Sequence, residues 1–282
     1  MDQQAMRVIR LALDEDIGSG DITTRVTVPE DLRAVARLLA KDEGVISGID
    51  VAGVVFHEVD PRINYQPLVD DGARIQRGAI LCEVSGPARS ILTAERTALN
   101  ILQHLSGIAT LTARYVEAVQ GTKARIVDTR KTGPGLRLLE KAAVRHGGGH
   151  NHRFGLSDGV LIKDNHLAAI GGPDRIARAI AAAREQAPHT LRIEIEVTSL
   201  DELEQALAAR ADVVLLDNMS IAEMGEAVER AAGRVKLEAS GGVSLETVRA
   251  IAETGVDLIS VGALTHSAPA LDISLEVELS RD

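Results

Sequence analysis

The chain has 282 residues, 45% of them hydrophobic, and a formal net charge of −10. This length buries a substantial core, which excludes a disordered chain and a disulfide-dense miniprotein. The acidic charge and the scarcity of aromatic residues (two Phe, two Tyr and no Trp) argue against a nucleic-acid partner. No run approaches the roughly 18 apolar residues of a membrane span, and Cys82 is the single cysteine. We therefore expect a cytoplasmic protein without disulfides and without a membrane partner.

The first part of the chain mixes helices with short extended segments. Apolar residues at helical spacing from Met6 to Leu13 predict a helix that ends at the glycines near position 18. Extended segments are predicted at 36–40, 44–49 and 79–84, because turn residues separate them. A long helix is predicted from Thr93, since apolar residues then recur every three or four positions up to Tyr115.

Beyond residue 122, six short apolar runs alternate with helical segments. The runs cover 125–128, 159–163, 192–197, 213–217, 235–239 and 258–262. The last four strand ends, Glu196, Asp217, Ser240 and Gly262, lie 21, 23 and 22 residues apart, the length of one strand–helix unit. This spacing predicts parallel strands joined by right-handed crossovers. We expect a (β/α) barrel, with a doubly wound open sheet as the alternative; six strands rather than eight leave a complete barrel undemonstrated.

Functional groups of such barrels lie where strands end and helices begin. Along 192–197, Glu194 and Glu196 alternate with apolar residues and are expected to face the barrel axis, with Glu196 nearer the mouth. Glu196 and Asp217 close neighbouring strands, and such paired acids suit Mg²⁺ or ribose hydroxyls. The alternative interpretation is a buried structural ion pair with Lys163 or Arg130.

Small residues close the last two strands. They are Ser240, Gly241 and Gly242 after one strand and Val261, Gly262 and Ala263 after the next. Small side chains there allow backbone N–H groups and a following helix N-terminus to approach a phosphate. For either of these turns alone, the alternative is an ordinary tight turn without a ligand. Two such turns at adjacent strand ends favour a phosphate site.

The segment 128–166 is cationic within an acidic chain. It holds seven Lys and Arg against four acids, and four of the eight histidines. Such a basin indicates a small polyanionic substrate. The basic residues at strand ends or in glycine-rich loops are the candidates to bind it: Arg130, Lys131, Arg153 and Lys163. The charged residues at helical spacing are interpreted as one solvent-exposed face of a helix. They are Arg137, Glu140, Lys141 and Arg145.

Three other chemistries are conceivable in this segment. His146, His150 and His152 could form a metal site, although no cysteine supports one. Ser157 lies in a G-x-S-x-G pattern, but a strand follows the serine where a nucleophile elbow requires a helix. Lys163 at a strand end could form a Schiff base, while the neighbouring guanidinium groups favour anion binding.

Eight ordered segments resemble the quinolinate phosphoribosyltransferase family. They are TAERTALNILQHLSGIAT, DTRKTGPGLR, HGGGHNHR, DGVLIKDNH, EIEV, LLDN, LEASGG and SVGALTHS. With DIGSGDITT near the start, the resemblance covers nearly the whole chain. It implies an N-terminal α/β sandwich domain (1–110), an incomplete (β/α) barrel with the catalytic site (111–270) and a C-terminal segment (271–282) that returns to the N-terminal domain. It also implies a homodimer with shared active sites.

The resemblance also implies a reaction and the residues that perform it. Phosphoribosyl would pass from 5-phosphoribosyl 1-diphosphate to quinolinate with loss of CO₂, giving nicotinate mononucleotide for NAD biosynthesis with Mg²⁺ as cofactor. Quinolinate would be held by residues of both subunits: Thr129, Arg130, Lys131, His152, Arg153 and Lys163, with Arg96 of the partner subunit. Glu196 and Asp217 would meet the ribose and the metal, and the two small-residue turns the phosphate. The alternatives are a paralogous transferase acting on another acid, a Lys163 Schiff-base lyase, and a non-catalytic metabolite-binding protein.

Overall fold

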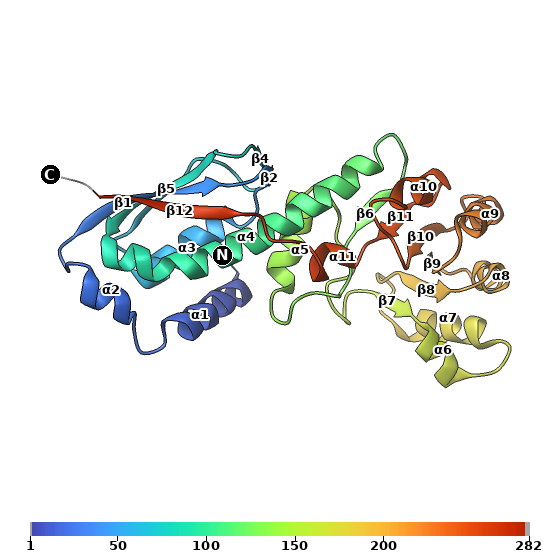
Figure 1. Cartoon of the computed structure of the whole chain (residues 1–282). Helices are drawn as coiled ribbons and strands as arrows, with labels where there is room; N and C mark the ends of the chain where they lie inside the picture. The colour runs from blue at the N-terminus through green and yellow to red at the C-terminus, as the bar shows by residue number, and fades with distance from the viewer. Residues whose placement is uncertain (1, 280–282) are drawn as a thin grey trace. The chain divides into compact units, whose positions relative to one another are not determined.

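The computed structural model describes residues 2–279, which form two compact units (Figure 1). Within residues 2–279, the first unit contains 2–113, 132–148 and 264–279, and the second contains 114–131 and 149–263. The sequence placed 132–148 in the barrel, whereas the structure places this segment in the first unit. Polar contacts explain this difference: His146 Nδ1 lies 2.8 Å from Ser47 Oγ, and Glu140 accepts a hydrogen bond from His104 at 2.8 Å.

The first unit is built on a four-stranded antiparallel sheet in the order β12-β1-β5-β3. The strands are β1 (Arg33–Ala40), β3 (Asn64–Pro67), β5 (Ile80–Pro87) and β12 (Ile273–Leu279). Alternate residues of β1 are buried from Ala34 to Ala40, which is the period of a strand with one covered face. The pair β2 (Gly44–Val45) and β4 (Arg74–Ile75) forms a second, two-stranded sheet.

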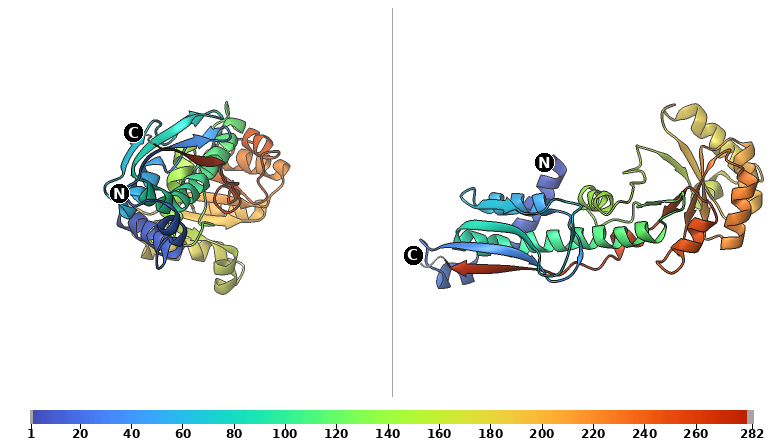
Figure 2. Two further views of the ribbon diagram at one scale, coloured as in Figure 1. Left: turned by 60° about the vertical axis from the view of Figure 1, so that its left-hand side comes forward. Right: turned by 90° about the horizontal axis from the view of Figure 1, so that it is seen from above.

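Helices cover one face of this sheet, which makes the unit an α/β sandwich (Figures 1 and 2). The helices of the unit are α1 (Gln3–Ile17), α2 (Ile22–Thr27), α3 (Ile49–Val59), α4 (Ala88–Ala118) and α5 (Arg137–His146), of which α5 lies beyond the end of the sheet. The first helix ends at Gly18, as the sequence predicted. The C-terminal segment contributes β12, which pairs with β1 along Ala34–Ala40.

Two predicted elements have different bounds in the structure. The strand predicted at 44–49 stops at Val45, because Gly48 adopts a positive φ of +97° and Asp71 accepts hydrogen bonds from the N–H groups of Gly48 and Ile49, which start α3. The helix predicted from Thr93 begins at Ala88, directly after β5. Ile91 is buried and belongs to the same helix face, so the apolar face of this helix begins before Thr93, where the sequence repeat predicted its start.

The solvated face predicted for 137–145 is wrong for two of its residues. Glu140 is fully buried and Lys141 is 2% exposed. The Glu140 carboxylate accepts hydrogen bonds from His104 and from the N–H of Gly133, which offsets the cost of burying its charge. Helical spacing of charged residues therefore did not indicate a solvent-facing stripe here.

The second unit contains six parallel strands in the order β6-β11-β10-β9-β8-β7. They are β6 (Arg125–Val127), β7 (Val160–Ile162), β8 (Ile193–Val197), β9 (Val213–Asp217), β10 (Lys236–Ser240) and β11 (Leu258–Ser260). Within residues 2–279, β6 and β7 do not pair with each other, so the barrel stays incomplete. The fold class predicted from the strand spacing is confirmed.

Helices connect these strands on their outer side (Figure 1). They are α6 (Asp164–Ile170), α7 (Arg175–Gln186), α8 (Leu200–Ala208), α9 (Ile221–Ala231) and α10 (Val248–Glu253), with the short α11 (Ala263–His266) after β11. Ser199 and Ser220 cap α8 and α9 by accepting hydrogen bonds from the N–H groups of Glu202 and Glu223. Among residues 2–279, none of the helices combines the length and apolarity needed to cross a membrane.

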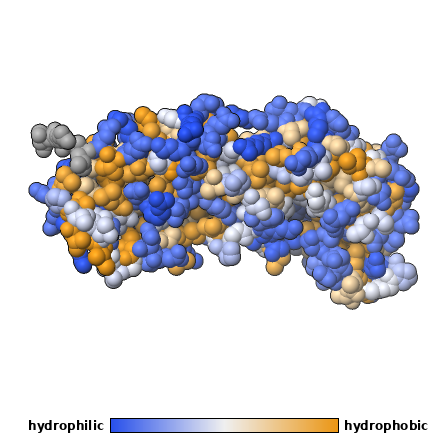
Figure 3. All heavy atoms as spheres, in the orientation of Figure 1, coloured by the Kyte–Doolittle hydropathy of each residue, from blue (hydrophilic) through white to orange (hydrophobic). Residues whose placement is uncertain are grey.

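Large apolar side chains are exposed on the first two helices. Leu11, Ile22 and Val26 are 65–71% exposed. Figure 3 shows apolar residues at the surface at the end of the first unit where α2 lies. Contiguous exposed apolar surface commonly marks an interaction site.

Packing within the first unit predicts a sharp difference between two glycines in helices. A Cβ at Gly107 in α4 would overlap the carbonyl oxygen of Pro269, so Gly107→Ala should destabilise the protein by about 1–3 kcal/mol. Gly225 in α9 has open space around it, and Gly225→Ala should be neutral or stabilising by up to about 1 kcal/mol. Urea unfolding of both variants measures the difference. Equal stability of the two variants would contradict the packing at Gly107.

Candidate functional site

Residues at or next to the carboxyl ends of all six strands line one cavity of about 490 Å³ in the second unit. This convergence requires the sheet to curl around the cavity, as an incomplete barrel does. The predicted site residues that line it are Thr129, Arg130, Lys131, His152, Arg153, Lys163, Glu196, Asp217, Ser240, Gly241 and Gly242.

Four predicted site residues are not among those that line this cavity. Val261, Gly262 and Ala263 follow the end of β11, next to strand β10. Arg96 is exposed on α4 in the first unit. The structure therefore groups the candidates for quinolinate, ribose and one phosphate turn, and leaves these four outside the group.

Sequence analysis missed five residues that line the cavity. They are Leu161, Leu215, Asn218, Glu238 and Ser260. Four of them precede a predicted site residue of the same strand or strand end by two positions: Leu161 before Lys163, Leu215 before Asp217, Glu238 before Ser240 and Ser260 before Gly262. Because strand side chains repeat their direction every two residues, this period was the signal that could have found them.

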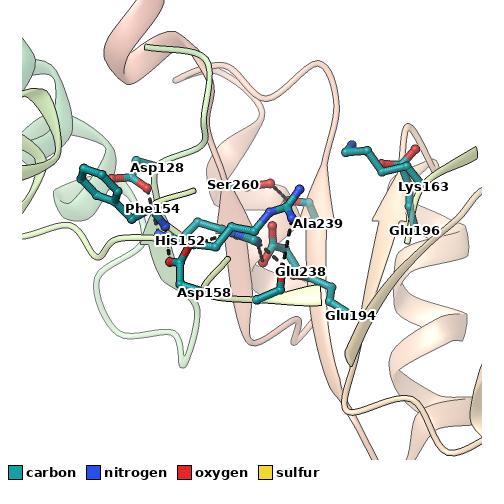
Figure 4. A network of polar contacts seen from close by, with 12 residues as sticks. Asp128, His152, Phe154, Asp158, Lys163, Glu194, Glu196, Glu238, Ala239 and Ser260 are labelled. Atoms are coloured by element: carbon teal, nitrogen blue, oxygen red, sulfur yellow. Dashed lines mark hydrogen bonds and ion pairs between the residues drawn. The ribbon is translucent and has the colours of Figure 1, made fainter. Parts of the chain in front are cut away.

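The loop that carries His152 and Arg153 is fixed by two carboxylates (Figure 4). Asp128, fully buried after β6, accepts hydrogen bonds from the Asn151 side chain at 2.6 Å and the His152 N–H at 2.8 Å. Asp158 accepts hydrogen bonds from the N–H groups of Phe154 and Gly155. A short loop with this many anchors holds its side chains in place, which suits a preorganised binding site.

Two guanidinium groups lie near each other on one side of the cavity. Burial, and next the charge of Arg130, lower the pKa of Arg153 from its ordinary value. Arg153 also donates a hydrogen bond to the carbonyl oxygen of Gly159 at 3.2 Å. Like charges that a fold holds near one another favour an anionic ligand, because the ligand removes their repulsion.

Lys163 and Glu196 form an ion pair across neighbouring strand ends. Lys163 Nζ lies 2.6 Å from Glu196 Oε2. Figure 4 shows the two side chains next to each other. Such a pair was the structural alternative for Glu196. The Lys163 side chain is however 45% exposed, and both residues line the cavity. The pair is therefore accessible to a ligand from the cavity side.

Asp217 lies beside the glycine turn that follows the next strand. Its carboxylate accepts a hydrogen bond from the Asn218 side chain at 2.8 Å, and the Asn218 N–H donates to the carbonyl oxygen of Ser240 at 2.9 Å. Gly241 has a φ of +91°, and a Cβ there would overlap the Asn218 amide. The turn therefore requires glycine at position 241, which lets backbone come close to the acidic strand end.

A second group of ionisable side chains lies deeper in the barrel. His152 Nε2 is 3.0 Å from Glu194 Oε2 and 3.6 Å from Glu238 Oε2. Burial, and next the Glu194 carboxylate, raise the pKa of Glu238 well above the usual range of a carboxyl. One oxygen of each glutamate is buried without a hydrogen-bond partner. Glu194 and Glu238 therefore lie next to each other, and the His152 ring contacts both of them from the loop before β7.

The tautomer of His152 argues against a metal at this group. Its Nδ1 accepts a hydrogen bond from the Arg153 N–H at 2.7 Å, so the ring proton lies on Nε2. Nε2–H donates to Glu194 and has no lone pair for an ion. The histidine metal site considered from the sequence gains no support: His146 bonds Ser47 in the first unit, and His150 is exposed.

Comparisons with known proteins match both halves of the chain. Residues 21–106 match the model of the quinolinate phosphoribosyl transferase N-terminal domain, and residues 108–276 match that of the C-terminal domain. The chain is 50% identical to a nicotinate-nucleotide pyrophosphorylase [carboxylating] of Mycobacterium leprae, with 97% of each chain covered. It is 43% identical to quinolinate phosphoribosyltransferase [decarboxylating] 1b of Nicotiana tabacum, which covers 96% of this chain and 81% of that protein.

A solved structure gives the same result for the fold. The nicotinate-nucleotide pyrophosphorylase from Francisella tularensis superposes with a TM-score of 0.91 at 44% identity, with 98% of this chain and 96% of that chain covered. The similarity therefore extends over both units and is not limited to the barrel.

Proposed function

Because the chain belongs to the quinolinate phosphoribosyltransferase family, we propose that it joins quinolinate to 5-phosphoribosyl 1-diphosphate, forming nicotinate mononucleotide, diphosphate and CO₂. The observation that carries this proposal is a single cavity whose lining combines a cationic side with an acidic, glycine-rich side. A dicarboxylate needs the first side, and a phosphorylated sugar needs the second.

Arg130, Arg153 and Lys163 bind the two carboxylates of quinolinate. Planar guanidinium groups orient planar carboxylates through paired hydrogen bonds better than ammonium groups do. When quinolinate binds, the Lys163 ammonium group contacts a substrate carboxylate in place of Glu196 or together with it. Thr129, Lys131 and His152 line the same side of the cavity.

Glu196 and Asp217 serve the ribose and the metal ion. Mg²⁺ prefers oxygen donors and is commonly held by one or two carboxylates together with substrate phosphates, a pattern that these two strand-end acids fit. When bound, Mg²⁺ would neutralise diphosphate charge. The backbone of Ser240–Gly242, and that of Val261–Ala263 after β11, are the candidate phosphate turns.

Charge explains the order of the chemistry. Loss of diphosphate leaves positive charge on the ribose, which the carboxylates of Glu196 and Asp217 stabilise. Attack by the pyridine nitrogen then makes the ring cationic. The cationic nitrogen stabilises the carbanion that remains when the adjacent carboxylate leaves as CO₂, so decarboxylation needs no further cofactor.

We also propose that the enzyme acts as a cytoplasmic homodimer with shared active sites. The exposed apolar residues Leu11, Ile22 and Val26 support an interface on the first unit. Arg96, exposed on α4, is the residue that we assign to the quinolinate site of the other subunit. The buried state of the single thiol, Cys82, fits a reducing compartment but does not require one.

One assay tests the proposed reaction directly. Purified protein, quinolinate, Mg²⁺ and 5-phosphoribosyl 1-diphosphate are mixed, and CO₂, diphosphate and nicotinate mononucleotide are quantified. The three products should form in equal amounts. Binding of quinolinate without any product would instead identify a metabolite-binding protein, and turnover of a different acid would identify a paralogous transferase.

Substitutions should separate the two sides of the cavity. Lys163→Ala should weaken quinolinate binding by roughly 10- to 150-fold, the effect of losing about 1.5–3 kcal/mol of a charged hydrogen bond, while binding of 5-phosphoribosyl 1-diphosphate stays unchanged. Asp217→Ala should chiefly lower kcat, by roughly 10²–10³-fold, because its charge matters most as the ribose becomes cationic. Calorimetry and steady-state kinetics measure the two effects.

Lys236→Ala is the matched control for these variants. Lys236 is exposed at the opposite end of β10, so its loss should change neither binding nor kcat. Full turnover by both Asp217→Ala and Glu196→Ala would mean that the acidic pair has only a structural role.

A further inference from the structure

The floor of the cavity contains one ionisable strand residue. We use floor for the residues Leu161, Leu215, Glu238 and Ser260, which line the cavity from positions below the strand-end residues that bind the substrates. Leu161 and Leu215 are apolar, and the Ser260 hydroxyl is uncharged near pH 7. Glu238 is therefore the single group of this floor that exchanges a proton under ordinary conditions.

Glu238 also faces the other side of the barrel. It lines a second cavity of about 380 Å³, together with His152, Arg153 and Glu194 and with residues at the amino-terminal ends of the strands, such as Arg192 and Val213. Glu238 is 1% exposed and, like His152 and Arg153, it lines both cavities. It therefore has a route to solvent that a substrate in the first cavity does not block.

The surroundings of Glu238 favour its neutral form. The groups that face it are Glu194 from β8, His152 from the loop before β7 and the Ser260 hydroxyl from β11 (Figure 4). His152 Nε2 lies closer to Glu194 than to Glu238, and the Arg153 guanidinium also acts on Glu194, so both of these groups serve the other carboxyl more than Glu238. Burial and the neighbouring Glu194 therefore favour the protonated form of Glu238, because a second negative charge at this distance is repelled strongly in a medium of low dielectric constant.

We propose that Glu238 is the catalytic acid that protonates ring carbon C2 as CO₂ departs, an inference that rests on the function proposed above. The bond between C2 and its carboxylate breaks, and the electron pair stays on C2 beside the cationic nitrogen. C2 then takes the proton of the Glu238 carboxyl, forming the C–H bond of nicotinate mononucleotide. Glu238 is left as a carboxylate and recovers a proton from solvent through the second cavity.

This assignment explains why a further acid, besides Glu196 and Asp217, is buried in a site whose substrates are anions. A carboxylate would repel the dianionic substrate, whereas a neutral carboxyl does not. A carbanion formed in this cavity needs a proton donor within reach, because until it is protonated it can recapture CO₂. A donor with a raised pKa remains protonated near neutral pH, when the substrate carboxylates are ionised.

The test compares the two chemical steps in Glu238→Gln, which keeps the shape and neutrality of the protonated acid but cannot donate its proton. In a single turnover, diphosphate should be released at the wild-type rate. Formation of CO₂ and nicotinate mononucleotide should slow by roughly 10²–10⁴-fold, and the ribosylated dicarboxylate should accumulate. Glu238→Asp, which retains an acid, should recover part of the decarboxylation rate. Equal slowing of both steps, or a wild-type rate of both, would overturn the proposal.

The pH dependence gives a second readout. In the wild-type protein the decarboxylation rate should fall on the alkaline side, as Glu238 loses its proton. Glu194→Gln removes the neighbouring negative charge, which lowers the pKa of Glu238, so this fall should begin at a lower pH. An unchanged alkaline profile in Glu194→Gln would overturn the role of Glu238 even if Glu238→Gln failed to fold. Absence of diphosphate release by the wild-type protein would instead refute the proposed function itself.

Discussion

Nicotinate should be used roughly 10⁴-fold less efficiently than quinolinate, measured as the ratio of kcat/KM values. It lacks the C2 carboxylate, so part of the cationic side of the cavity would be left without a partner. Sites built to pair with a charged or polar group reject an analogue that lacks it by up to roughly 10⁴–10⁵-fold. An unfilled site is especially unfavourable because burial, and next the charge of Arg130, already lower the pKa of Arg153.

The control for this selectivity uses the same cavity. Lys163→Ala should narrow the ratio between the two substrates, because it lowers kcat/KM for quinolinate more than for nicotinate. Product is followed by separating nicotinate mononucleotide from the free acids. Comparable turnover of nicotinate and quinolinate by the wild-type protein would remove quinolinate as the substrate.

At quinolinate concentrations well below the wild-type KM, Arg96→Ala and Lys163→Ala should each lose most of the activity when alone, yet recover activity when they are mixed. If Arg96 serves the site of the partner subunit, a dimer with one subunit of each kind has one site with both defects and one with neither. Random assortment makes half of the dimers mixed, so activity should return to about a quarter of the wild-type value. Co-refolding of the two denatured variants in equal amounts, followed by the standard assay, measures the recovery.

The mixing experiment includes its own control. Co-refolding Lys163→Ala with Asp217→Ala, two residues that line the same cavity of one chain, should give no recovery, because every site then keeps one defect. If Arg96 acted on its own subunit, its mixture would behave in the same way. No recovery from Arg96→Ala with Lys163→Ala would therefore disprove the shared site.

Sequence period predicted the second unit well, because parallel strands and their helices repeat at a nearly constant length. The spacing of Glu196, Asp217 and Ser240 located three of the strand ends, and these residues line one cavity in the structure. The alternation in β8 also predicted that Glu194 and Glu196 lie on the interior side. Both line cavities, Glu196 at the carboxyl end of the barrel and Glu194 deeper inside.

The features that the sequence did not predict depend on contacts between residues that are distant in the chain. Glu140 and Lys141 are buried because α5 packs in the first unit, and nothing local distinguishes that helix from a solvated one. Glu238 escaped notice because it lies in the middle of a strand, where a glutamate is expected to cost stability. Its neighbours Glu194 and His152 come from a strand and a loop that are distant in the chain, so the pairing appears only in three dimensions.

The position of β1 between β5 and β12 has a consequence for how the chain is made. Arg37 of β1 and Glu278 of β12, which form a hydrogen bond at 3.1 Å, are 241 residues apart. At ribosomal speeds of about 5–20 residues per second, one edge of β1 waits roughly 10–50 s for its partner strand. During that interval the strands of the second unit emerge in full and can assemble, while the first unit displays an open sheet edge that other chains can join. The first unit, most of which is synthesised before the second, is therefore completed after it, and the nascent chain is most exposed to misassembly along Ala34–Ala40.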